Sequence, residues 1–522
     1  MKSKILRLFL AGIVLCASAC TANYMDINKE PSTVDKDQME ADGYLTRIPL
    51  VALQGLVIPN DVNMHQFIEC LLGGSMGGYL ADSNQGFRQK YSTYNPEEHW
   101  IQVPFNDLIP NTFQNFNKLI SLSEDKVQIA VAAITKIAIM ARVTDIYGPV
   151  PYSKIGEDGK QTAPYDSQKE IYTSFFTELD EAIEVLTTHR TDKFTPLADK
   201  VYGGNVENWA KFANSLKLRL AMRVVNADEA LAKTKAEEAV NSEVGVFTSN
   251  SDNATFETTK NPFRVVMYEY NGGDSRISAD ITSYMNGYSD PRRAAYFTES
   301  VFTEDANGDP INNGFFGLRS GVIIPKGEYR KYSNMKVESG DKLLWMNAAE
   351  VAFLRAEGAL RGWNMQGSAE SLYNTGITLS FEQWGVNGAD AYLANSDKTP
   401  QPYKDPQGFF SYTGTPSTIT IKWNSSVSFE KNLEQIITQK WIANFPLGHE
   451  AWAEFRRTGY PKLMEALDNK SSSTVNDKRM ARRLMYPQSE YTENAVNVSN
   501  AVSEYLFGPD NMGTDLWWAK KN

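Results

Sequence analysis

The sequence predicts a mainly α-helical fold, in which tetratricopeptide-like helical hairpins carry loop-rich insertions and there is only minor β-structure. Amphipathic periodicity with readable caps and stops recurs along the chain, and several of these helices follow one another across short turns. Between them the sequence becomes rich in Gly, Asn, Asp, Pro and Thr. We therefore expect helical repeats at about 43–241, 342–385 and 429–460, and insertions at about 245–341 and 386–428.

The N-terminus has the features of an export signal. Basic residues precede an apolar run over residues 8–15, which is much shorter than the roughly 20 residues of a membrane-spanning helix. Residues 17–20 (Ala-Ser-Ala-Cys) are similar to a bacterial lipobox, so we expect a signal peptide at 1–19 and a lipidated Cys20. An ordinary signal peptide with a nearby cysteine is the alternative. The polar segment 20–42 is typical of a flexible tether.

Composition excludes several classes of function. The chain has 52 basic and 63 acidic residues, a net charge of -11, which argues against nucleic acid and anionic lipid head groups as partners. Cys16 leaves with the signal and Cys70 has no partner, so no disulfide is expected. The four histidines are scattered singly without HExxH or CxxC spacing, so neither a zinc enzyme nor a cofactor is indicated.

The first helices are the most clearly marked. Residues 126–146 are apolar almost all round and stop at Gly148, which predicts a central helix. Ser167 and Glu170 have the spacing of a capping box and start the next helix. Residues 208–225 form an apolar stripe, and 228–240 form the partner helix.

The later helices also come in pairs. Residues 344–360 are crowded with alanine, and after a turn 369–381 form a second helix, giving a hairpin of tetratricopeptide size. Residues 430–445 and 449–457 are predicted as another pair. We find at least three hairpins without a strict 34-residue period. The insertions contain short strand-like pieces such as 418–423.

Two motifs suggest chemistry but lack its context. Residues 73–77 match G-x-S-x-G with Ser75 as the nucleophile, yet the flanking sequence does not form the strand and helix of a nucleophile elbow, so we expect the glycines to serve a turn. Asp305, Asn307 and Asp309 have the spacing that opens a calcium loop, but Pro310 replaces the required glycine. A turn between strands is the better prediction, and no metal site is assigned.

Aromatic residues in two polar stretches are the best candidates for a binding site. Flat rings can pack against the C–H faces of sugars, while neighbouring polar side chains hydrogen-bond the hydroxyls. The alternative is that each ring packs into the protein's own core. The predicted ligand-binding residues are Asp82, Asn84, Arg88, Tyr91, Trp100, Tyr268, Tyr284 and Tyr329.

Several segments together resemble the SusD/RagB family of outer-membrane nutrient-binding lipoproteins. They are 144–152 (TDIYGPVPY), 209–223 (WAKFANSLKLRLAMR), 352–363 (AFLRAEGALRGW), 440–461 (KWIANFPLGHEAWAEFRRTGYP) and 482–487 (RRLMYP), with the lipobox in front. Their order and spread cover nearly the whole chain.

The resemblance implies a single domain at 43–522 with about four hairpins and an irregular ligand-binding half. It further implies a non-enzymatic protein that binds a glycan or a peptide and delivers it to a SusC-like TonB-dependent transporter. The lipid would anchor it to the outer membrane, facing the cell surface. Only Asp26 and Glu30 follow Cys20 closely, which is fewer acidic residues than surface-exported members often carry. A location on the periplasmic face of the outer membrane is therefore the alternative. Two alternatives are a surface glycoside hydrolase and a structural repeat adaptor. The hydrolase stays open because, among 63 acidic residues, a catalytic carboxylate pair cannot be recognised from sequence.

Overall fold

The computed structural model describes residues 43–156, 162–312, 314–325 and 327–519. The predicted signal peptide at 1–19, the lipidated Cys20 and the tether to residue 42 lie outside these residues. By their internal contacts, the described residues from 49 onward form one compact unit, and residues 43–48 belong to a separate one. Helix α4 (Tyr44–Val57) runs across this boundary.

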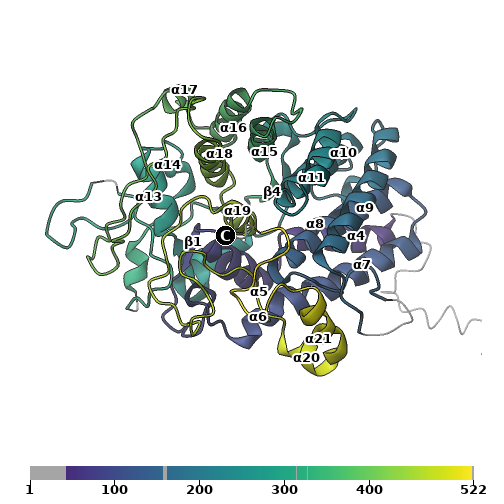
Figure 1. Ribbon diagram of the computed structural model, residues 1–522, viewed down its shortest axis with the longest axis horizontal. Coiled ribbons are helices and arrows are strands. Elements are labelled where there is room, and N and C mark those ends of the chain that lie inside the picture. The colour runs from purple at the N-terminus through teal and green to yellow at the C-terminus, as the bar shows by residue number, and fades with distance from the viewer. Residues whose placement is uncertain (1–42, 157–161, 313, 326, 520–522) are drawn as a thin grey trace, which may run out of the picture. The chain divides into compact units, whose positions relative to one another are not determined.

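Helices dominate the unit formed by residues 49–522, which confirms the mainly α fold class (Figure 1). Helix α10 packs against α9, α11 and α15, and α15 packs against α16 and α18, so helices from both halves of the sequence lie side by side. No helix in the described ranges is long and apolar enough to cross a bilayer. The main helices are α6 (Glu98–Asn106), α7 (Leu108–Leu122), α8 (Lys126–Tyr147), α9 (Gln168–Thr188), α10 (Val206–Arg223), α11 (Glu229–Val240), α15 (Ala348–Leu360), α16 (Ala369–Gln383), α18 (Phe429–Ala443) and α19 (Gly448–Thr458).

Local signals set the helix ends. The Asp125 carboxylate accepts hydrogen bonds from the first backbone N–H groups of α8, and Gly148 ends this helix with a φ of 92°. Ser167 and Glu170 form the predicted capping box of α9. Because Gly376 in α16 has no Cβ, the Phe353 ring of α15 can lie against the helix; a Cβ there would be 2.7 Å from the ring.

Helix α19 does not form the simple pair with α18 that the sequence predicts. Its main contacts are with the π-helix η1 (Gln66–Gly74), whereas α18 packs against α15 and α16. The reason is a glycine contact, since a Cβ on Gly448 would lie 2.3 Å from the carbonyl carbon of Gly73. Two backbones can therefore approach where any side chain would separate them.

The predicted insertions contain short elements and two small sheets. Strand β1 (Leu80–Asp82) pairs antiparallel with β3 (Ser275–Ile277), and β2 (Ala254–Phe256) pairs antiparallel with β4 (Leu343–Met346). The short helices are α5 (Val62–His65), α12 (Pro262–Arg264), α13 (Ala279–Gly287), α14 (Arg293–Tyr296), α17 (Ala389–Leu393), α20 (Gln488–Glu493) and α21 (Ala495–Glu504).

Residues 418–423 form no strand, contrary to the sequence prediction. Side chains satisfy their backbone carbonyls instead of a neighbouring strand. Gln435 donates to the carbonyls of Thr420 at 3.2 Å and Lys422 at 2.8 Å, and the Tyr373 hydroxyl donates to that of Ile421 at 2.6 Å.

The loop-rich region has a small core of its own beside the large core of the helices. Phe302, Phe316 and Phe410 pack on it from outside. This second core supports loops that carry little secondary structure. Its buried members are Ala81, Leu318, Val322, Ile324, Tyr329 and Tyr332.

Candidate ligand-binding site

Strand pairing brings the two predicted aromatic stretches together. Asp82 of β1 lies opposite Ser275 of β3, and the Ser83 N–H donates to the Asp274 carbonyl at 2.9 Å. Just beyond the strand, the Asn84 amide donates to the Asp274 carboxylate at 2.8 Å. The turn that follows β1 therefore lies beside the loop that precedes β3, although they are 190 residues apart in sequence.

A buried carboxylate orients the side chains at this edge. Asp274 is 1% exposed and also accepts hydrogen bonds from Asn271 at 3.0 Å and Gln66 at 2.5 Å. Burial raises the pKa of Asp274 despite these donors. Tyr329 joins the edge by donating to the Asn271 carbonyl at 2.8 Å. We call the set Asn84, Asn271, Asp274, Arg276, Tyr329 and Arg330 the rim.

Two guanidinium groups lie beside the Tyr329 ring. The Cζ of Arg276 is 4.8 Å from the ring centroid and that of Arg330 is 5.6 Å from it. Arg276 donates to the carbonyls of Met267, Ser275 and Gly272 at 2.8–3.1 Å. Burial lowers the pKa of Arg276 to about 10, so it is still charged at neutral pH.

Most of the predicted aromatic residues are part of the core. Asp82 is 3% exposed and pairs with Lys90 and Ser92. The Tyr91 hydroxyl donates to the Trp100 carbonyl at 2.5 Å, and both rings are buried. Tyr284 and Tyr329 are 4% and 6% exposed. These side chains fill the protein interior in this structure.

The accessible members of the predicted set are Asn84, Arg88 and Tyr268. Arg88 is exposed in the turn that begins at Asn84, while Asn84 and Tyr268 are half-buried. The Tyr268 hydroxyl donates to the Met335 carbonyl at 2.5 Å, and Arg264 covers its ring at 4.0 Å. The role of the eight residues in binding stays a prediction. Only these three side chains are accessible to a ligand without a rearrangement of the structure.

Tyr284 lies apart from the rim and lines a pocket of about 330 Å³ between α13 and residues 400–417 and 459–465. Its hydroxyl donates to the Lys462 carbonyl at 3.0 Å. The pocket lining is mixed, with Ser283, Tyr412 and Glu465 among its members. None of the other seven predicted residues lines this pocket.

Sequence analysis missed an exposed aromatic residue, Phe409, which is 77% exposed. Asp405 holds its loop, since one carboxylate oxygen accepts from the N–H groups of Phe409 at 3.0 Å and Phe410 at 3.1 Å. Gln407 donates to Glu328 at 2.7 Å, next to the rim in sequence. The Asp-Pro-Gln-Gly turn followed by two phenylalanines was the available sequence signal.

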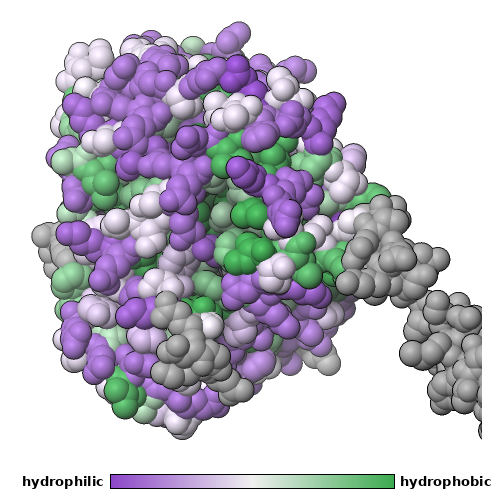
Figure 2. Space-filling view, turned by 90° about the vertical axis from the view of Figure 1, so that its right-hand side faces the viewer, coloured by the Kyte–Doolittle hydropathy of each residue, from purple (hydrophilic) through white to green (hydrophobic). Residues whose placement is uncertain are grey.

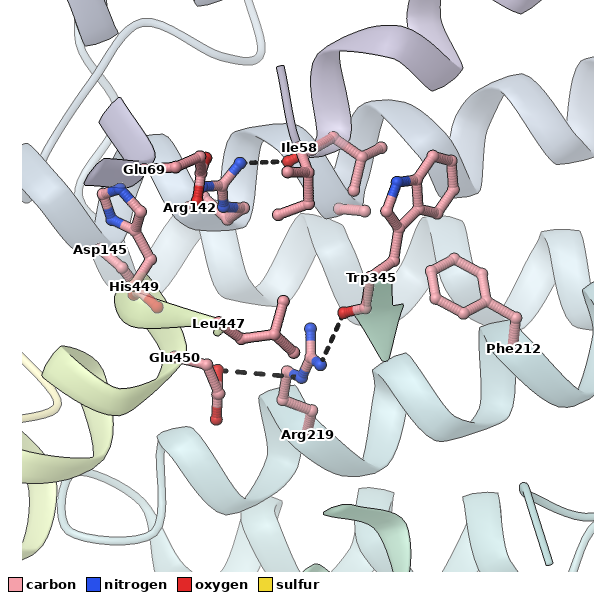
Figure 3. Close-up of a pocket in the computed structure, with 12 residues that line it drawn as sticks. Ile58, Glu69, Arg142, Asp145, Phe212, Arg219, Trp345, Leu447, His449 and Glu450 are labelled. Atoms are coloured by element: carbon pink, nitrogen blue, oxygen red, sulfur yellow. Dashed lines mark hydrogen bonds and ion pairs between the residues drawn. The ribbon is translucent and has the colours of Figure 1, made fainter. Parts of the chain in front are cut away.

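A cluster of buried charges lies between the helices, around a cavity of about 40 Å³ (Figure 3). In the close-up Arg142 lies beside Glu69, and Arg219 points toward Glu450 and the Trp345 carbonyl. Burial opposes ionisation of Glu450, but the charge of Arg223 at 2.5 Å, with those of neighbouring cations, lowers its pKa to about 2. Burial raises the pKa of Glu69 and Asp145 in the same lining, but each carboxylate is bonded to an arginine and the cavity has room for little more than water, so a sugar could not reach them. The cluster therefore has the features of a structural ion-pair network.

The G-x-S-x-G segment does not form a nucleophile elbow. Ser75 is 3% exposed and follows the π-helix η1 where an elbow would follow a strand. The nearby His449 ring is bonded to the Ile68 carbonyl at 2.7 Å. Gly73 packs against His449, and the Gly78 N–H bonds back to the Ser75 carbonyl in a turn.

The calcium-like spacing belongs to a tight turn. One carboxylate oxygen of Asp305 accepts hydrogen bonds from the N–H groups of Asn307 at 2.8 Å and Asp309 at 3.0 Å. Glu304 and Pro310 flank it as an antiparallel bridge. Among the described residues, no group of three or more His, Cys, Asp or Glu side chains is placed to hold a metal ion.

Comparison with known proteins identifies the family. The model of the family described as SusD-like, "Susd and RagB outer membrane lipoprotein", matches residues 26–519. A SusD homologue of Bacteroides uniformis is 50% identical, with a TM-score of 0.87, and the match covers 92% of this chain and 100% of that one. A SusD homologue of Bacteroides thetaiotaomicron is 43% identical, with a TM-score of 0.85 and coverage of 91% and 99%.

A chitin-binding SusD homologue of Flavobacterium johnsoniae is 37% identical, with a TM-score of 0.85 and coverage of 91% and 99%. No curated protein matches the chain. The family match spans nearly the whole sequence and agrees with the helical fold, which confirms the resemblance found in the sequence. The chain belongs to the SusD-like family of outer-membrane lipoproteins.

Proposed function

We propose that this protein binds a nutrient glycan at the rim, without altering it, and delivers it to a TonB-dependent transporter in the outer membrane. The observation that carries the proposal is the Asn84–Asp274 contact, which joins two distant loops into one exposed polar edge. The family is one of outer-membrane lipoproteins, and a 37% identical relative is named as chitin-binding. That relative favours a glycan over a peptide.

The rim offers the mixed chemistry that sugar recognition requires. Amides and guanidinium groups can donate to hydroxyl and ring oxygens. Phe409 presents an exposed apolar ring, and its loop reaches the rim segment through the hydrogen bond from Gln407 to Glu328. Asp274 holds two of the amides before any ligand arrives. Such preorganisation lowers the entropy lost on binding.

The membrane and transporter parts of the proposal rest on family membership and on the lipobox at residues 17–20. The side of the molecule near α7 and α9 is largely hydrophilic, with hydrophobic side chains gathered near its middle (Figure 2). A mixed surface of this kind suits a partner that binds reversibly, because such interfaces are about as polar as the rest of a protein surface. We infer that the helical side is available for the transporter while the loops hold ligand.

The binding proposal is tested with the purified protein on a glycan array that includes chitin oligosaccharides, followed by affinity electrophoresis. We expect retention by at least one glycan, and weaker retention of the Asn84→Ala and Arg88→Ala variants. Asn115→Ala on α7 is the matched control, because Asn115 bonds within its own helix. Release of new reducing ends would instead indicate a glycoside hydrolase, and binding of peptides alone would indicate a peptide-binding member.

The partner is tested in the native membrane. Affinity capture of the lipidated protein from detergent-solubilised outer membrane should recover a TonB-dependent barrel. Cys20→Ala should release the protein from the membrane fraction, because only the acyl chains provide stable anchoring. Recovery of no barrel transporter would contradict the delivery role, and protease accessibility on intact cells decides which face the protein occupies.

A further inference from the structure

The rim contains two guanidinium groups that form no ion pair with a carboxylate in the described part of the chain. Arg276 and Arg330 both lie within 6 Å of the Tyr329 ring centroid, so two guanidinium groups flank one side chain. Within the described residues neither has an ion pair with a carboxylate, and Arg276 is bonded only to backbone carbonyls. Burial lowers the pKa of Arg276 and the charge of Arg330 lowers it further, while the charge of Asp274 acts in the opposite direction.

Asp274, whose charge acts on Arg276, is already engaged. It accepts amide hydrogen bonds from Asn84, Asn271 and Gln66 at 2.5–3.0 Å, and no salt bridge to it is found among the described residues. Arg276 is 4% exposed and, like the buried Arg456, bonds to backbone carbonyls and not to a carboxylate in the described part of the chain. Arg88, in the turn after Asn84, adds a further exposed cation on the same loop.

Two glycines form the backbone against which these guanidinium groups lie. Gly272 and Gly273 have φ angles of 78° and 109°, in the left-handed region. A Cβ on Gly272 would lie 2.3 Å from an Arg330 nitrogen, and one on Gly273 would lie 2.1 Å from an Arg276 nitrogen. Both φ angles favour glycine, and a Cβ on Gly273 would also lie 2.5 Å from the Met267 carbonyl oxygen, so the two guanidinium groups lie against backbone that has no side chain.

We propose that the rim selects an acidic glycan, and that Arg330, supported by Arg276, receives a carboxylate or sulfate group of the sugar. The proposal rests on the glycan-binding function proposed above and names the class of glycan. A guanidinium can donate two parallel hydrogen bonds to a carboxylate or sulfate, and such bonds are stronger than those to neutral hydroxyls. The second positive charge beneath Arg330 strengthens the attraction.

The test compares acidic polymers with neutral forms of the same backbone. Polygalacturonate, hyaluronan and heparin are offered to the purified protein beside carboxyl-reduced polygalacturonate, carboxyl-reduced hyaluronan and desulfated heparin. We expect at least one acidic form to bind about tenfold or more tightly than its neutral counterpart, with affinity that falls as salt is added.

The matched variants are Arg330→Gln and Arg190→Gln. Both remove one positive charge from an exposed side chain, but Arg190 lies outside the rim and pairs with Glu243. Only Arg330→Gln should lower affinity for the acidic glycan, by about tenfold, and reduce its salt dependence. Unchanged melting temperatures would show that both variants fold.

Four outcomes overturn the proposal. Equal binding of acidic and neutral forms, or equal effects of the two variants, would leave the glycan-binding function standing and remove its acidic specificity. Equal binding of polyglutamate would replace the glycan with an acidic peptide. Binding of no glycan at all would overturn the proposed function as well.

Discussion

Replacing Arg457 by methionine tests whether the buried charges between the helices stabilise the fold. Arg457 is fully buried and donates to Glu357 at 2.6 and 2.7 Å and to Glu454 at 2.7 and 2.9 Å. Methionine fills similar space without charge or donors. The change therefore removes one positive charge and four hydrogen bonds from a site that water does not reach.

The expected loss of unfolding free energy depends on the cations that remain beside Glu357 and Glu454. Removing one partner of a buried ion pair costs about 3–5 kcal/mol. Glu357 retains Arg361 at 2.8 Å, and Glu454 retains Arg223 at 2.8 Å and Lys440 at 3.3 Å. Because each carboxylate keeps a cation, we expect the lower end, about 3 kcal/mol, at neutral pH.

The loss should depend on pH. Burial opposes ionisation of Glu357 and Glu454, but Arg457 and neighbouring cations hold the pKa of each below its ordinary value. Their stabilisation is present above the unfolded pKa of about 4.3 and is lost as the pH falls below it. Without Arg457 both pKa values rise, so the variant loses less stability in acid. The difference from wild type should shrink between pH 7 and pH 4.

Urea unfolding followed by circular dichroism at both pH values measures the difference. Lys342→Met is the control, because Lys342 and Glu257 form a half-exposed pair at 3.0 Å that should contribute less than about 1 kcal/mol. A loss for Arg457→Met below about 1 kcal/mol at neutral pH, or the same loss at both pH values, would refute the reasoning.

Four further outcomes are expected. Tyr91→Phe should lower the free energy of unfolding by about 1 kcal/mol and leave glycan affinity unchanged; a drop in affinity would make the ring part of the site. Phe409→Ala should show the opposite pattern, with an unchanged melting temperature and weaker binding on the glycan array. Gly448→Ala should destabilise by about 1–3 kcal/mol in thermal melts, because its Cβ would clash with Gly73, and a neutral result would show that the helices can separate. Burial lowers the pKa of His65 to about 3, so between pH 6.5 and 3 only the unfolded state binds a proton at this residue. The free energy of unfolding should therefore fall as the pH drops toward 3. The His65→Gln variant should show a smaller dependence on pH in thermal melts.

Helix positions could be predicted because their signals are local. The sequence predicts helices at 126–146 and 208–225, and the structure has them at Lys126–Tyr147 and Val206–Arg223. Caps and apolar stripes act within a few residues of the helix they define. The partner of α19 could not be predicted, since it depends on Gly73 and Gly448 meeting across the fold.

The binding site was harder to predict for the same reason. The polar residues around Tyr91 and Trp100 indicate a loop, but burial depends on which distant segments cover that loop. The contact of Asn84 with Asp274 spans 190 residues and has no local signal. The turn chemistry that holds Phe409 outward is local, and this residue could have been found from the sequence.

Buried aspartates connect the fold to the site. Asp274 positions Asn84, and Asp405, which is 4% exposed, positions Phe409 while its other oxygen accepts from Tyr332 of the second core at 2.6 Å. Each acid fixes the base of a loop and leaves its tip in solvent. Substitutions at the tips therefore cost little stability, whereas substitutions at the acids would disturb the second core. This separation allows the exposed side chains to set the choice of ligand on a helical scaffold that stays the same.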